Sequence, residues 1–120
     1  MTLFGEELRR LRAERGVTQR AMAAELGVSA AYLSALEHGK AGKPSFGLVQ
    51  RIIVWSGLIW DEAERLQRLA DLSDPRVTVD TVSAGALATC LANRMAEDIA
   101  TLDERTVEAM LDLLDGAQRD

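Results

Sequence analysis

Side chains that could perform catalysis or bind a metal ion are few in this chain of 120 residues. The single histidine, His38, follows Glu37, and the pair could serve acid–base chemistry. A lone histidine before Gly39 is more typical of a helix end, where the helix dipole favours a cation. The single cysteine, Cys90, has no second cysteine for a disulfide or a thiolate metal site. We therefore expect no catalysis, no cofactor and no metal.

Cys90, Trp55 and Trp60 each leave two interpretations open. Cys90 lies on or beside an apolar helix face, which favours a small buried hydrophobe, although redox sensing is an alternative. Trp55 and Trp60 flank a Ser-Gly break, and they are more typical of core and interface anchors than of an aromatic ligand cage.

Basic side chains, which bind phosphate, are unevenly distributed along the chain. The net charge of −5 by itself disfavours a nucleic-acid partner. Residues 1–57, however, hold eight basic and five acidic residues, whereas residues 58–120 hold six and fourteen. A DNA-facing module joined to a partner-facing module would show this asymmetry. Residues 1–15 alternate in charge, unlike an apolar signal segment, and with the single cysteine they indicate a cytoplasmic protein without a membrane span.

Five short helices are expected to form the N-terminal domain, which contains the basic half of the chain. Their predicted ranges, from capping residues and apolar periodicity, are 3–15, 19–26, 30–38, 46–55 and 60–72. Only Gly27, Val28 and the capping Ser29 separate the second helix from the third. Helices joined by so tight a turn must cross steeply, which is the geometry of a helix-turn-helix, although a plain helical bundle is the alternative.

The residues of this turn carry a resemblance to a known family. The matching segments are Thr18-Gln19, Ala24-Glu25-Leu26-Gly27-Val28-Ser29, Leu33-Ser34-Ala35-Leu36-Glu37-His38-Gly39, Lys40 and Pro44-Ser45. They resemble the helix-turn-helix of the xenobiotic-response-element (XRE) family, which includes the phage Cro and repressor proteins. The match runs in register from Phe4 to Trp55 and implies a DNA-binding module.

The resemblance implies a role for each matching position. The third helix would enter the major groove, where the residues facing the bases would be Ser29, Ala30, Ala31, Tyr32, Ser34 and Ala35. Phage members hold glutamine at several of these positions. Alanine can contact a thymine methyl but cannot read donors and acceptors, so we expect T-rich contacts, readout of DNA shape or modest specificity.

The resemblance also implies phosphate contacts and a structural ion pair. The phosphate candidates are Thr18, Gln19, Arg20, Lys40 and Lys43, although a solvated surface is the alternative for the three cations. Arg12 and Glu37 occupy positions that form a partly buried ion pair in family members.

Residues 74–120, which make up most of the acidic half, are expected to form a separate domain. We place the boundary between residues 1–73 and 74–120, because residues 76–82 alternate in β-branched residues and predict a short strand or extended arm. A helix capped by Ser83 and running to about 101, and another capped by Asp103, should follow. The stripe predicted to form a homodimer is Leu87, Leu91, Met95, Ile99 and Leu102. Alternatively, these helices fold back on their own first domain.

The expected protein is thus all-α and non-enzymatic. It would be a transcriptional regulator, repressor or activator, that binds a palindromic operator as a homodimer. Two other classes remain open: an antitoxin whose acidic helices neutralise a basic toxin, and a protein-interaction adaptor that has lost DNA binding.

Overall fold

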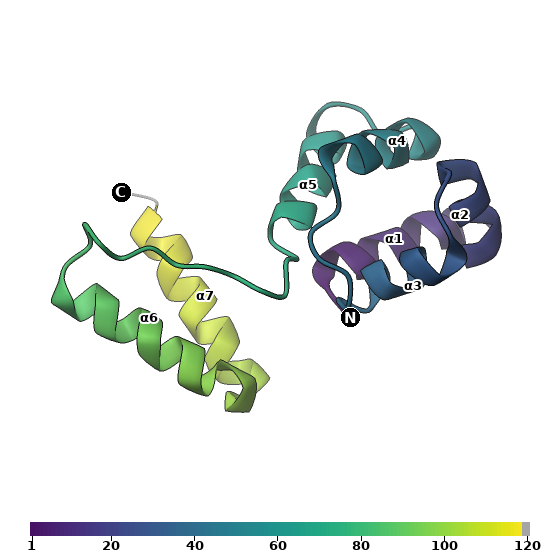
Figure 1. Ribbon diagram of the computed structural model, residues 1–120. Coiled ribbons are helices and arrows are strands. Elements are labelled where there is room, and N and C mark those ends of the chain that lie inside the picture. Colours follow the sequence, from purple (N-terminus) through teal and green to yellow (C-terminus); the bar gives the residue numbers. More distant parts are fainter. Residues whose placement is uncertain (119–120) are drawn as a thin grey trace. The chain divides into compact units, whose positions relative to one another are not determined.

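The computed structural model describes residues 1–118, and in that range it is all-helical (Figure 1). It divides into an N-terminal unit, Met1–Val77, and a C-terminal unit, Thr78–Asp120. The N-terminal unit contains α1 (Leu3–Arg15), α2 (Gln19–Leu26), α3 (Ala30–Glu37), α4 (Phe46–Ser56) and α5 (Trp60–Asp71). The C-terminal unit contains α6 (Ala86–Asp98), the 3-10 turn η1 (Ile99–Thr101) and α7 (Glu104–Gln118). None of the described helices is both long enough and apolar enough to cross a membrane.

Hydroxyl side chains start the first four helices. Thr2, Thr18, Ser29 and Ser45 each accept a hydrogen bond from the backbone N–H three residues ahead, at 3.0–3.1 Å. Loss of such a cap typically costs about 1 kcal/mol. These local signals explain why the predicted helices lie within a residue of the observed ones.

One hydrophobic core joins the five helices of the N-terminal unit. Helix α3 packs on α1 and α2, while α5 packs on α1 and α4. The buried core residues are Phe4, Leu8, Leu11, Met22, Ala23, Leu26, Leu33, Leu36, Leu48, Val49, Ile52, Leu66 and Ala70. Trp55 packs half-buried against this core. Trp60 lies outside it, with 82% of its surface exposed.

A polar clamp joins the two ends of this unit. The hydroxyl of Ser73, just after α5, donates to the carbonyl of Leu69 at 2.6 Å and accepts from the backbone N–H of Phe4 at 3.2 Å. Phe4 lies in the first turn of α1, where backbone N–H groups have no partner within the helix. The clamp therefore holds the end of α5 beside the beginning of α1.

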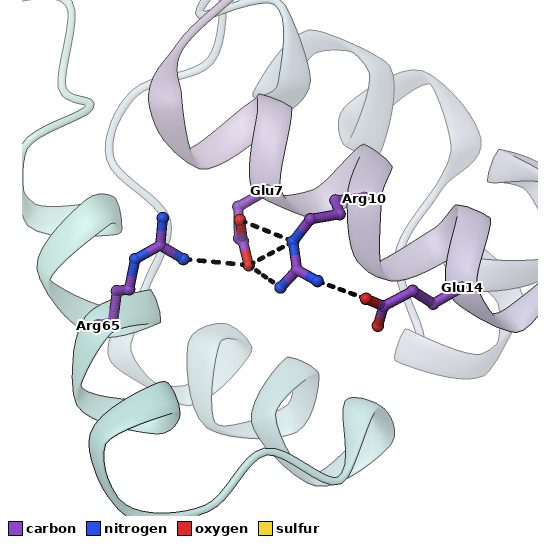
Figure 2. Close-up of polar contacts among 4 residues, drawn as sticks. All are labelled: Glu7, Arg10, Glu14 and Arg65. Carbon is purple, nitrogen blue, oxygen red and sulfur yellow. Dashed lines mark hydrogen bonds and ion pairs between the residues drawn. The ribbon is translucent and has the colours of Figure 1, made fainter.

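A network of charged side chains also connects α1 to α5 (Figure 2). Glu7, only 8% exposed, accepts hydrogen bonds from Arg10, and Arg65 of α5 approaches its Oε1 to 3.4 Å. Arg10 in turn pairs with Glu14. The hydrogen bond from Arg10, with the nearby charge of Arg65, lowers the pKa of Glu7 below its ordinary value.

The C-terminal unit departs from the prediction at its start. Residues 76–82 form no strand, and α6 begins after Gly85 without a side-chain cap from Ser83. A β-branched segment favours extended backbone, but a strand requires a neighbouring strand to accept its hydrogen bonds. Asp103 does cap α7, since its carboxylate accepts from the N–H of Thr106 at 3.0 Å. Neither α6 nor α7 contains a buried residue.

Candidate nucleic-acid interface

The turn between α2 and α3 is held by its own backbone and by α4. Gly27 ends α2 with φ of 74°, in the left-handed region that favours glycine. Arg51 of α4 donates from Nη1 to the carbonyl of Leu26 at 3.0 Å, which satisfies one of the unpaired carbonyls at the end of α2. Ser29 then caps α3. The arrangement fixes α2 and α3 as a helix-turn-helix.

Helix α3 has one buried face and one exposed face. Leu33, Leu36 and Glu37 are buried against the neighbouring helices. The predicted base-facing residues lie on the remaining surface: Ser29, Ala30, Ala31 and Tyr32 are exposed, and Ser34 and Ala35 are half-buried. Helix α3 therefore leaves a face of alanine, serine and tyrosine side chains open to solvent.

The residues predicted to contact DNA phosphates differ in what they contact within the protein. Thr18 caps α2, while Arg20 and Lys40 are exposed. Lys43 forms an ion pair with Asp71, the last residue of α5, at 3.0 Å. This pairing, together with a hydrogen bond from Gln67, lowers the pKa of Asp71. Gln19 donates from Nε2 to the carboxylate of Glu37.

Glu37 is the buried charge on which three helices converge. It has no exposed surface, and its Oε1 lies 2.5 Å from Nη1 of Arg12 in α1. Gln19 contributes the second hydrogen bond from α2. Gly5 allows this convergence, because a Cβ at that position would lie 2.1 Å from the carbonyl oxygen of Glu37. The ion pair therefore belongs to the scaffold beneath α3.

The C-terminal unit contains a groove that is lined by apolar side chains. A hollow of about 370 Å³ lies between α6 and α7, and it is lined by Leu91, Met95, Ile99, Val107, Met110, Leu111, Leu113 and Leu114. Of the predicted dimerisation stripe, Leu91, Met95 and Ile99 line this groove. Leu87 stands outside it with 87% of its surface exposed, and Leu102 is half-buried.

The residues considered for catalysis or metal binding, His38 and Cys90, lie at a helix end and on an exposed helix. His38 ends α3, with its Nδ1 2.8 Å from the carbonyl oxygen of Ser34. Cys90 is exposed on α6, so the expectation that it is buried is wrong for the single chain. Within residues 1–118, no three acidic, histidine or cysteine side chains are grouped to hold a metal ion.

Several residues that shape this interface were not singled out from the sequence. Asp71 pairs with Lys43, Arg51 supports the turn and Ser73 clamps α1. Their partners lie 25 to 69 residues away along the chain. Periodicity and capping patterns describe only local neighbours, so no local signal could have found them.

This fold and this surface define the class of helix-turn-helix DNA-binding proteins. The chain belongs to the family described as "Helix-turn-helix domain", whose model matches residues 3–76. It is similar to the HTH-type transcriptional repressor RghR of Bacillus subtilis (strain 168), with 40% identity over 65 residues, which are 50% of this chain and 48% of that protein. The chain thus matches about half the length of this curated relative. No solved structure shows significant similarity.

Proposed function

We propose that the chain is a sequence-specific transcription regulator that binds a palindromic operator as a homodimer and acts as a repressor. The observation that carries this proposal is the exposed face of α3, which a capped and buttressed turn presents above a buried ion pair. The name of the similar Bacillus subtilis protein supports repression as the direction of control.

Base recognition would use few direct hydrogen bonds. Ala30, Ala31 and Ala35 would contact thymine methyl groups, while Ser29, Tyr32 and Ser34 supply the hydroxyls of this surface. The Ser29 oxygen already accepts from the N–H of Tyr32 as the helix cap, so its hydroxyl hydrogen remains for DNA. We therefore propose a T-rich operator read partly through its shape.

Phosphate contacts would come from the two ends of the motif. Thr18, Gln19 and Arg20 lie at the start of α2, where the helix dipole favours an anion. Lys40 and Lys43 lie in the loop that follows α3. Lys43 must exchange its ion pair with Asp71 for a phosphate, so we assign it a weaker contribution than Lys40.

Dimerisation would bury the apolar surface of the C-terminal unit. A hairpin of two helices without a buried residue has no core of its own. Leu87, Leu91 and Leu111 are each more than half exposed. A second copy that offers the same groove would form a four-helix arrangement, and the dimer would carry the two α3 helices that a palindromic operator requires.

An antitoxin remains the second candidate because of the charge of the C-terminal unit. Residues 78–120 carry nine acidic and three basic residues. Such a surface would also attract a basic partner protein. Purification of the chain with the product of an adjacent small basic reading frame would favour this candidate.

The experiment that tests the proposal is selection of binding sites from randomised duplex DNA, followed by sequencing, at two salt concentrations. The wild type should recover a two-fold symmetric motif. The double variant Arg20→Ala, Lys40→Ala should bind that motif more weakly and with a shallower salt dependence. Arg105→Ala, which removes an arginine from α7, should bind it as the wild type does. Binding by the wild type without any motif would contradict sequence-specific regulation and favour the antitoxin or the adaptor.

A further inference from the structure

The buried carboxylate of Glu37 fixes the orientation of the Gln19 side-chain amide. Its oxygens accept from Nη1 of Arg12, at 2.5 Å, and from Nε2 of Gln19. An ionised carboxylate only accepts hydrogen bonds, so it must face the NH₂ side of the Gln19 amide and not the oxygen side. The direction of that amide is therefore determined by Glu37. Its nitrogen retains one further hydrogen.

Glu37 itself has little freedom to move. Its carbonyl oxygen accepts from the N–H of Thr2 at 3.3 Å, and α1 approaches it so closely that Gly5 has no room for a Cβ. The side chain has no exposed surface. The group that orients Gln19 is thus held through its backbone and through its carboxylate.

Gln19 occupies the position where an oriented donor would matter for DNA. It is the first residue of α2, directly after the capping Thr18, and the residue is half-buried. Phosphate oxygens accept hydrogen bonds from side-chain amides and from helix N-termini at such positions. A free glutamine would lose rotamer freedom on binding, whereas one already held in place loses less.

We propose that the Arg12–Glu37 ion pair holds the Gln19 amide so that its second Nε2 hydrogen donates to a DNA phosphate. Glu37 is then a positioning residue for DNA binding that acts through Gln19 without touching DNA. This inference rests on the proposed function, because it requires that the helix-turn-helix bind duplex DNA. It adds a role in binding to an ion pair that would otherwise only stabilise the fold.

The test is a double-mutant cycle in the full chain. Gln19→Met keeps the length of the side chain but removes the donor, and Glu37→Gln removes the charge that orients it. Affinity for a mixed-sequence duplex is measured over a range of salt, since phosphate contacts carry no sequence information. Gln50→Met, at an exposed position of α4, is the matched control.

Each single variant should lower the affinity about tenfold, the value of one lost hydrogen bond to a charged group. Gln19→Met should leave the salt-dependence slope unchanged, because a neutral amide releases no counterion. The double variant should fall no further than Gln19→Met alone, because the two changes break the same path. Gln50→Met should leave slope and affinity unchanged. Affinity losses that add in the double variant, or an unchanged affinity for Gln19→Met, would overturn the inference and leave the proposed function intact.

A measurement on the wild type covers the case in which Glu37→Gln does not fold. The two side-chain amide hydrogens of Gln19 can be followed by NMR before and after addition of the duplex. One should exchange slowly with solvent in the free protein, and the other should shift when DNA is added. Averaged hydrogens, or hydrogens that DNA leaves unchanged, would overturn the inference. A wild type that binds no duplex would overturn the proposed function as well.

Discussion

The Nζ of Lys43 lies 3.0 Å from Oδ1 of Asp71, so the loop after α3 is joined to the C-terminal end of α5. The pair is partly exposed, with side-chain exposures of 47% and 36%. DNA phosphates would compete with the carboxylate for this lysine. If Lys43 contacts a phosphate, as the family resemblance implies, Asp71 would therefore weaken that contact.

Removal of this carboxylate should strengthen DNA binding. Asp71→Asn frees Lys43 and also removes a negative charge near the bound backbone. Affinity should rise by up to about fivefold for each half-site, the upper value for an exposed ion pair. The salt-dependence slope should steepen, as measured by fluorescence anisotropy across a salt series. Asp112→Asn makes the same charge change in α7, and an equal rise for that control would show that total charge is responsible.

Gly5 should tolerate no side chain, because its Cβ would meet backbone. A Cβ there would lie 2.1 Å from the carbonyl oxygen of Glu37, so Gly5→Ala must push α1 away from the end of α3. The expected loss in free energy of unfolding is about 3 kcal/mol. Urea denaturation followed by circular dichroism measures it. Gly47→Ala in α4 has open space around its Cβ and should instead stabilise by up to about 1 kcal/mol.

Acid should weaken the connection between α1 and α5. The pKa of Glu7 is lowered in the folded protein, chiefly by the hydrogen bond from Arg10, so its ionised form stabilises the fold. This contribution is complete above the unfolded pKa, near the ordinary value of 4.5, and disappears as the pH falls through the lower folded pKa. Glu7→Gln should cost about 1–2 kcal/mol at neutral pH. It should also flatten the dependence of stability on pH below about 5.

The contribution of Glu7 is measured by urea midpoints collected across that pH range. Glu64→Gln, a change of the same kind at an exposed position of α5, serves as the control. If both variants keep the wild-type pH profile, the acid sensitivity of the fold lies in other carboxylates.

The apolar groove of the C-terminal unit should control the oligomeric state. Leu111→Glu places a charge in the groove between α6 and α7, and it should weaken the dimer by about a hundredfold. Sedimentation equilibrium measures the dissociation constant. Val54→Glu makes a comparable change on α4, at a side chain that is 80% exposed, and should leave the dimer intact. A wild type that is monomeric at all accessible concentrations would contradict the proposed interface.

The helices of the N-terminal unit could be predicted from the sequence. The contacts between residues far apart in the sequence could not. Thr18, Ser29 and Gly27 act on their immediate neighbours, so the limits of α2 and α3 follow from local chemistry. The pairing of Lys43 with Asp71 depends instead on how α5 packs. Of the two alternatives predicted for residues 76–82, a strand or an extended arm, the strand is absent, because β-branched composition cannot supply a neighbouring strand.

The position of Ser73 has a consequence for how this domain can be used in other proteins. Its hydrogen bond to Phe4 brings the point where the chain enters the helix-turn-helix unit next to the point where the chain leaves it. A module whose entry and exit are neighbours can be inserted within a loop of a host protein without stretching either connection. The unit is therefore suited to grafting as a single cassette, and such a cassette must retain the Ser73 hydroxyl.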